Sequence, residues 1–158
     1  MTEEEQRENV KRVAREWLGT PYHHRARVKG KGVDCAHVLI EIFVEAGIFE
    51  RFDPGKYSRD WHLHRGEEMY LQSLEKIAGD PIKADTSIHL WQAEGYKPLT
   101  GDVLLWRVGR TYSHGGVVTD WPYVVHASAP SQIVEEVIAF DTPVFNRPVR
   151  VYSFWRKQ

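Results

Sequence analysis

The chain of 158 residues contains a single cysteine, and this scarcity excludes two classes of protein. An internal disulfide needs two cysteines, and thiolate-rich zinc or iron–sulfur sites need several. The sequence therefore excludes a disulfide-stabilised scaffold and a thiolate metal protein. The one thiol is either an inert part of the core or a reactive nucleophile.

An excess of one charge is also missing, as is any long apolar run. Lys and Arg number 21 against 22 Asp and Glu, so the net charge is −1 and predicts neither nucleic acid nor an anionic membrane surface as a partner. No stretch is long and apolar enough to span a bilayer. Residues 1–8 lack the basic and apolar regions of a signal peptide. We therefore expect a protein that is made in the cytoplasm and has no membrane span.

The sequence is rich enough in apolar residues for a packed core: 42% are hydrophobic, and six are Trp. Its length predicts a single domain over residues 1–158. Helical patterns come first and short strand-like runs later, which predicts an α+β fold with an antiparallel C-terminal sheet. The helices are expected at 3–18, 35–46, 66–78 and 87–93, and the strands at 103–108, 115–119, 123–127, 133–138 and 149–154.

The single cysteine, Cys35, lies where the second helix is expected to begin. Asp34 before it is a favourable N-cap residue, and the apolar run after it ends at Gly47. A thiol in the first turn of a helix lies near unpaired backbone N–H groups and the positive end of the helix dipole. Both favour the thiolate, which is the nucleophilic form.

Two histidines lie in the strand-like segments downstream. His114 begins one expected strand and His126 ends the next, so antiparallel pairing brings both to the same edge of the sheet. His114 can then take the thiol proton and return it to a leaving amine, while His126 orients the His114 ring. The spacing predicts a Cys-His-His catalytic triad.

Structural interpretations of the same residues stay open. Cys35 can be an inert core thiol, and either histidine can be a buried residue with satisfied hydrogen bonds. His62 and His64 alternate in a way that suits a metal on a strand, although no carboxylate or cysteine pattern supports them. The basic segment 25–31 suits an anionic ligand, or is simply solvated.

Five short segments give the chain a resemblance to a known family. In their order they resemble the NlpC family, papain-like cysteine peptidases of bacterial cell walls, over about residues 10–140. The segment Tyr57–Trp61 is most similar to the phage and gene-transfer-agent branch of these peptidases. The five segments are Leu18–Tyr22, Val33–Cys35, Thr100–Leu105, Ser113–Val117 and Val125–Ser128.

The resemblance implies a papain-like fold, in which the nucleophile helix packs on the C-terminal sheet. It implies that Cys35 is the nucleophile, His114 the general base and His126 the third polar residue. The reaction would be hydrolysis of an amide bond in the peptidoglycan stem peptide, commonly between D-γ-glutamate and the diamino acid. No metal or organic cofactor is implied.

The resemblance also implies substrate-binding residues and partners. Tyr22 matches a tyrosine near the nucleophile that binds substrate or its oxyanion, and Asp34 and Ser113 match positions that border the peptide groove. The implied partners are a peptidoglycan stem peptide and phage tail proteins. A phage product would be assembled in the cytoplasm, reside in the virion tail and act at the cell wall.

Two residues depart from the family pattern. The family commonly has Asp-Cys-Ser-Gly, whereas this chain has Ala36 and His37 after the cysteine. We interpret both as changes of specificity, with His37 either crowding the cleft or adding a polar contact. Two alternatives to the peptidase remain open: a thiol acyltransferase or amidase that acts on another amide, and a catalytically weak assembly module of a phage tail.

Overall fold

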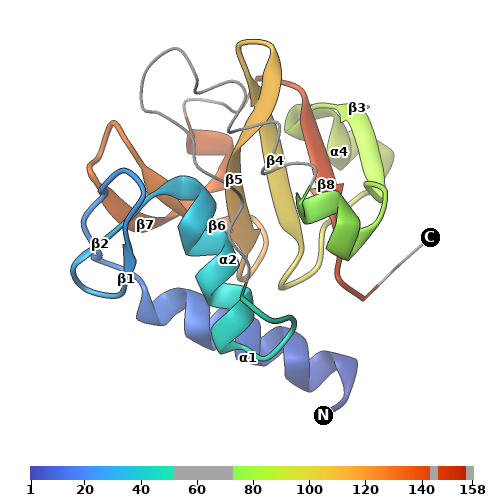
Figure 1. Cartoon of the computed structure of the whole chain (residues 1–158). Coiled ribbons are helices and arrows are strands. Elements are labelled where there is room, and N and C mark those ends of the chain that lie inside the picture. Colours follow the sequence, from blue (N-terminus) through green and yellow to red (C-terminus); the bar gives the residue numbers. More distant parts are fainter. Residues whose placement is uncertain (52–72, 143–145, 156–158) are drawn as a thin grey trace.

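The computed structural model describes residues 1–51, 73–142 and 146–155. Helices dominate the first half of the described chain and strands the second, as the sequence predicts (Figure 1). The helices with both ends among the described residues are α1 (Glu3–Glu16), α2 (Cys35–Glu45), α4 (Ile88–Glu94) and the 3₁₀ turn η1 (Ala139–Asp141). The strands are β1 (Arg27–Val28), β2 (Gly32–Val33), β3 (Lys83–Thr86), β4 (Val103–Val108), β5 (Thr111–Val118), β6 (Tyr123–Ser128), β7 (Ile133–Ile138) and β8 (Val149–Tyr152).

Six of the strands form one antiparallel sheet in the order β3-β8-β4-β5-β6-β7, and β1 pairs with β2 separately. Strands β4 to β7 follow one another as a meander, because short turns join each strand to the next. The predicted antiparallel meander is therefore confirmed. Its two central strands, β5 and β6, carry His114 and His126.

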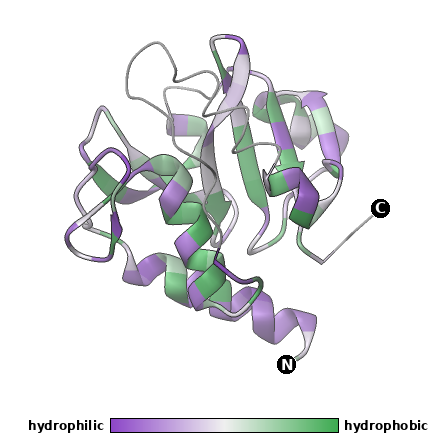
Figure 2. Ribbon diagram, viewed as in Figure 1, coloured by the Kyte–Doolittle hydropathy of each residue, from purple (hydrophilic) through white to green (hydrophobic). Residues whose placement is uncertain are grey.

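Apolar side chains pack on both faces of this sheet. On one face lie α1 and α2, whose buried residues meet those of β4, β5 and β6, including Leu105, Val117 and Val125. On the other face α4 places Ile88 and Trp91 against the sheet. Figure 2 shows the hydrophobic residues concentrated on α2 and the sheet strands. Helix α2 is buried almost all round, as its apolar sequence predicts, so its first residue is held firmly over the sheet.

Several element boundaries differ from the prediction. Strand β5 begins at Thr111 rather than at residue 115, because the tight turn at Gly109–Arg110 lets polar residues pair with β4. The edge strand β3 and the short β1–β2 pair were not predicted. Residues 73–78 of the expected helix at 66–78 are helical. The segment Tyr57–Trp61, with His62 and His64, lies outside the described residues.

A buried ion pair joins the first helix to the sheet and to the C-terminal segment. Arg7 of α1 donates to Asp102 Oδ1 at 2.9 Å and to the Thr100 carbonyl at 2.8 Å. Its guanidinium also lies 4.2 Å from the centre of the Trp155 ring, and Trp155 Nε1 donates to Gln6 at 2.8 Å. The start and the end of the described chain are thus fastened together.

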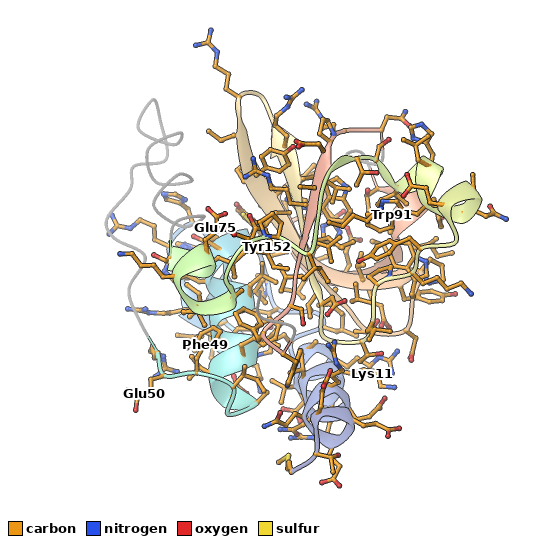
Figure 3. All side chains as sticks on the ribbon, turned by 90° about the vertical axis from the view of Figure 1, so that its right-hand side faces the viewer. Lys11, Phe49, Glu50, Glu75, Trp91 and Tyr152 are labelled. Atoms are coloured by element: carbon orange, nitrogen blue, oxygen red, sulfur yellow. The ribbon has the colours of Figure 1, made fainter. Side chains whose placement is uncertain are left out.

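Strand β8 is fastened to the helical residues 73–78 by a tyrosine. Tyr152 Oη donates to Glu75 Oε2 at 3.3 Å, and Figure 3 shows these side chains next to each other. Burial raises the pKa of the Tyr152 phenol, with the nearby Glu75 charge adding to the rise. Tyr152 therefore stays a neutral donor.

Candidate active site

The beginning of α2 is fixed by Asp34. Its backbone is extended (φ −106°, ψ 178°), and its Oδ1 accepts a hydrogen bond from the His37 backbone N–H at 2.9 Å. Its other oxygen accepts from the Arg25 backbone N–H at 2.7 Å. Asp34 is 2% exposed, so these bonds form away from water. They place Cys35 at the first helical residue, where the sequence predicts it.

His37 takes the place that a glutamate has in the usual capping box, three residues after the cap. Its Nδ1 lies 2.8 Å from Asp34 Oδ1, and the ring is almost entirely buried. Because a carboxylate only accepts, Nδ1 carries a proton and donates. His37 therefore adds a polar contact to the helix cap, and its effect on specificity stays a prediction.

Cys35 is partly exposed and faces the start of β5. Its Sγ lies 4.0 Å from the Ser113 carbonyl oxygen, next to His114 in the chain. One turn further along α2, Leu39 packs so closely on Gly115 that a Cβ there would lie 2.5 Å from Leu39 Cδ1. A glycine at 115 thus allows the nucleophile helix to approach β5.

The two predicted histidines are in direct contact. His114 Nε2 lies 2.8 Å from His126 Nδ1, and the rings meet edge to face with centroids 5.0 Å apart. The buried Trp106 ring lies 6.0 Å from the His114 ring, so one side of the pair is shielded from water. Since Nε2 of His114 is engaged by His126, Nδ1 is the ring nitrogen left to serve a thiol.

Both histidines are neutral at pH 7. Burial, together with the charge of His126, lowers the pKa of His114 to about 3. Burial also lowers the pKa of His126, although the Glu135 carboxylate opposes the shift. A neutral imidazole has one ring nitrogen that can accept a hydrogen bond or a proton.

Glu135 was not singled out in the sequence. It is paired with His126 across β6 and β7, and its Oε1 lies 3.2 Å from His126 Nε2. The register of the β6–β7 hairpin, counted outward from its turn at residues 129–132, could have placed it there. The sequence alone gave no reason to count to this position, because a glutamate on an edge strand is ordinary.

The predicted substrate-binding residues differ in their burial and in their contacts. Tyr22 is partly buried against the core, and its backbone N–H donates to the Gln132 carbonyl at 2.9 Å. Asp34 and Ser113 are buried, at 2% and 7% exposed. The carboxylate oxygens of Asp34 accept from this chain's own groups, and Ser113 turns its carbonyl toward the nucleophile. Contact of any of them with substrate stays a prediction.

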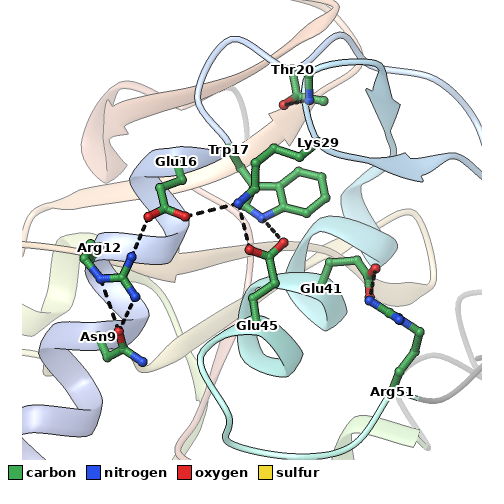
Figure 4. Close-up of polar contacts among 10 residues, drawn as sticks. Asn9, Arg12, Glu16, Trp17, Thr20, Lys29, Glu41, Glu45 and Arg51 are labelled. Carbon is green, nitrogen blue, oxygen red and sulfur yellow. Dashed lines mark hydrogen bonds and ion pairs between the residues drawn. The ribbon is translucent and has the colours of Figure 1, made fainter.

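The basic segment 25–31 is partly committed to internal ion pairs. Lys29 lies 3.1 Å from Glu16 and 2.7 Å from Glu45, and so ties this loop to α1 and α2 (Figure 4). Arg25 is exposed and lies close to the helix start through its backbone bond to Asp34. Of the four basic residues in this segment, Lys29 is thus paired with two carboxylates.

The described residues contain neither a metal-binding cluster nor a membrane-spanning helix. Within residues 1–51, 73–142 and 146–155, no group of three or more His, Cys, Asp or Glu side chains could hold a metal ion. Over the same part of the chain, no helix combines the length and the apolar character that crossing a membrane requires.

The fold of the described chain is similar to that of several solved structures. Neither a protein-family model nor a curated protein matches the sequence. NlpC2 from Trichomonas vaginalis aligns with 96% of this chain at a TM-score of 0.63 and 14% identity. The NlpC/p60 domain of the peptidoglycan hydrolase SagA aligns with 93% at 0.55 and 17% identity. An N-acetylmuramoyl-L-alanine amidase from Bacteroides uniformis aligns with 94% at 0.50 and 12% identity.

The chain therefore has the NlpC/p60 fold, and the predicted papain-like α+β architecture is confirmed. It spans 48% of the NlpC2 chain but 97% of the SagA domain and 98% of the amidase. The phage and gene-transfer-agent branch, suggested by Tyr57–Trp61, stays a prediction. So does the single domain over residues 1–158.

Proposed function

We propose that this chain is a cysteine peptidase that hydrolyses an amide bond in the peptidoglycan stem peptide. The observation that carries the proposal is the 2.8 Å contact between His114 and His126, next to a cysteine at the first residue of a capped helix. The NlpC/p60 fold supports it, since a solved domain with this fold belongs to a peptidoglycan hydrolase. Tyr22, Asp34 and Ser113 would border the bound peptide.

In the first half of the reaction, His114 Nδ1 takes the proton from Cys35 Sγ. The thiolate attacks the carbonyl carbon of the amide, and the backbone N–H of Cys35 stabilises the developing oxyanion. The C–N bond then breaks, and His114 gives its proton to the leaving amine. The acyl group remains on Cys35 as a thioester.

In the second half, water replaces the amine. His114 takes a proton from the water, the hydroxide attacks the thioester carbonyl, and the C–S bond breaks. The stem peptide leaves as a carboxylic acid and Cys35 regains its proton. Throughout, His126 holds the His114 ring so that Nδ1 faces the sulfur.

The bond that we propose is the one between D-γ-glutamate and the diamino acid. The amidase with this fold favours a second candidate, hydrolysis of the bond between muramic acid and L-alanine. Transfer of the acyl group to an amine rather than to water is a third. Phage tail proteins as partners, and action at the cell wall from a virion, belong to the proposal of the phage branch.

Incubation with defined muropeptides tests the proposal. The purified protein and its Cys35→Ala variant are given the same substrates, and the products are identified by mass spectrometry. Cleavage by the wild type alone would establish the hydrolase, and the product masses would name the bond. No cleavage of any stem peptide, together with slow alkylation of Cys35 at neutral pH, would leave only the assembly module.

A further inference from the structure

The carboxylate of Glu135 lies at the far end of the histidine pair. Across the β6–β7 ladder it is directly opposite His126, and its Oε1 lies 3.2 Å from His126 Nε2. We propose that Glu135 is a positioning residue that fixes the tautomers of both histidines and so keeps Nδ1 of His114 unprotonated. This inference rests on the proposed function, because it assigns the state of the general base.

The argument follows from the number of protons on the two rings. Each neutral imidazole carries one N–H, and a single proton lies between His114 Nε2 and His126 Nδ1. If His114 donates it, Nδ1 of His114 is bare and can take the thiol proton, and the proton of His126 is on Nε2. If His126 donates it, His126 Nε2 is bare and His114 carries its proton on Nδ1. Only the first arrangement gives a base.

Glu135 selects the first arrangement. A carboxylate accepts a hydrogen bond from an N–H on His126 Nε2, whereas it would repel a bare nitrogen lone pair at the same place. His126 is 3% exposed, so water does little to weaken this preference. The preference passes along the pair, because the tautomer of His126 dictates that of His114.

The position of the Glu135 carboxylate is itself restrained. Ser131 Oγ donates to Glu135 Oε1 at 3.0 Å, and the Ser131 backbone N–H donates to Ser128 Oγ at 3.2 Å. Glu135 Oε1 lies within ion-pair distance of His126 Nε2, but the two atoms are not aligned as a hydrogen bond. Among the described residues, His126 Nε2 therefore has no aligned hydrogen-bond partner. Since the Glu135 side chain is 30% exposed, it has room to turn into line.

Nitrogen NMR of the histidine rings tests the proposal without using hydrolysis. The protein is labelled with ¹⁵N at its eight histidines, and His114 and His126 are assigned with His114→Gln and His126→Gln variants. At pH 7 we expect Nε2 to be protonated in both wild-type rings. In Glu135→Ala we expect a mixture, with part of His114 protonated at Nδ1. Glu135→Gln should lie between the two, because its amide oxygen accepts without a charge.

Glu136→Gln is the matched control. Glu136 is the next residue of β7, and its carboxylate contacts Arg15 at 3.1 Å and Thr119 at 2.5 Å, away from the histidines. Its loss should leave the tautomers unchanged. In activity assays Glu135→Ala should lower kcat about 10- to 100-fold with little change in KM, and it should slow alkylation of Cys35.

The outcomes separate this inference from the proposed function. Unchanged His114 and His126 tautomers in Glu135→Ala would overturn the positioning role, even if kcat fell. If that variant does not fold, Glu135→Gln keeps the shape of the side chain and is judged by the same spectra. A tautomer shift in a protein that cleaves no muropeptide would support the positioning role while the proposed function failed.

Discussion

Two histidine–carboxylate pairs belong to the candidate active site, and they are built differently. His37 and Asp34 lie 2.8 Å apart within one helix turn, and both are nearly inaccessible to water. His126 and Glu135 lie 3.2 Å apart on two strands, and Glu135 is partly exposed. The first pair fixes the start of α2. The second pair lies next to His114, because His126 contacts both Glu135 and His114. With the function proposed above, the same chemical pair serves stability in one place and catalysis in the other.

Breaking the second pair at its histidine should have the largest effect. His126→Phe keeps a buried ring but removes both nitrogens, which leaves His114 Nε2 without its partner. We expect kcat to fall about 10³-fold, because the base loses its orientation and its tautomer. Muropeptide cleavage kinetics measure this. A variant with nearly wild-type kcat would show that His126 has no part in catalysis.

Breaking the first pair should instead lower stability. Asp34→Ala removes the cap of α2 and leaves the buried His37 side chain and the Arg25 backbone N–H without their acceptor. We expect the free energy of unfolding to fall by about 2–4 kcal/mol, measured by urea denaturation. Asp34→Asn is the control, since it keeps an oxygen for the cap and should lose less. Equal losses would assign the effect to charge alone.

The pH dependence of stability sharpens the same comparison. The pKa of His114 is lowered from 6.5 to about 3 in the folded protein, so the unfolded chain binds more protons between these values. The free energy of unfolding should therefore fall as the pH drops from 6.5 towards 3, by at most about 1.4 kcal/mol per pH unit from this residue. Urea denaturation at several pH values should show a shallower slope for His114→Phe. An identical slope would contradict the assignment.

The smallest effect is expected where the nucleophile helix touches the strand of the base. Gly115→Ala places a methyl group 2.5 Å from Leu39 Cδ1, so the Leu39 side chain must move. We expect a loss of about 1–2 kcal/mol, because overpacking strains the contact. Thermal unfolding measures it, and the double variant with Leu39→Val should recover part of the loss. If the double variant is no more stable than Gly115→Ala alone, the contact with Leu39 is not the cause of the loss.

The elements that carry the chemistry could be predicted from the sequence, and their supporting contacts could not. Asp34 marks the start of α2, and the apolar, β-branched character of 103–108 and 133–138 defines β4 and β7 with their observed ends. The hairpin spacing predicts the meeting of His114 and His126. Thr111–Ser113 and Lys83–Thr86 are too polar to be recognised as strands without their partners. The bond of His37 to the cap depends on a side-chain direction that spacing does not specify.

The contacts of Arg7 and Trp155 bear on how this fold can be rearranged. Because Gln6 and Arg7 contact Trp155, the first helix and the last described residue lie side by side. A short linker that joins Trp155 to the start of α1 would then cost little conformational entropy. New ends could be opened in an exposed turn such as Gly109–Arg110. Because α1 and Trp155 lie close together, the fold is also suited to insertion into a surface loop of another protein.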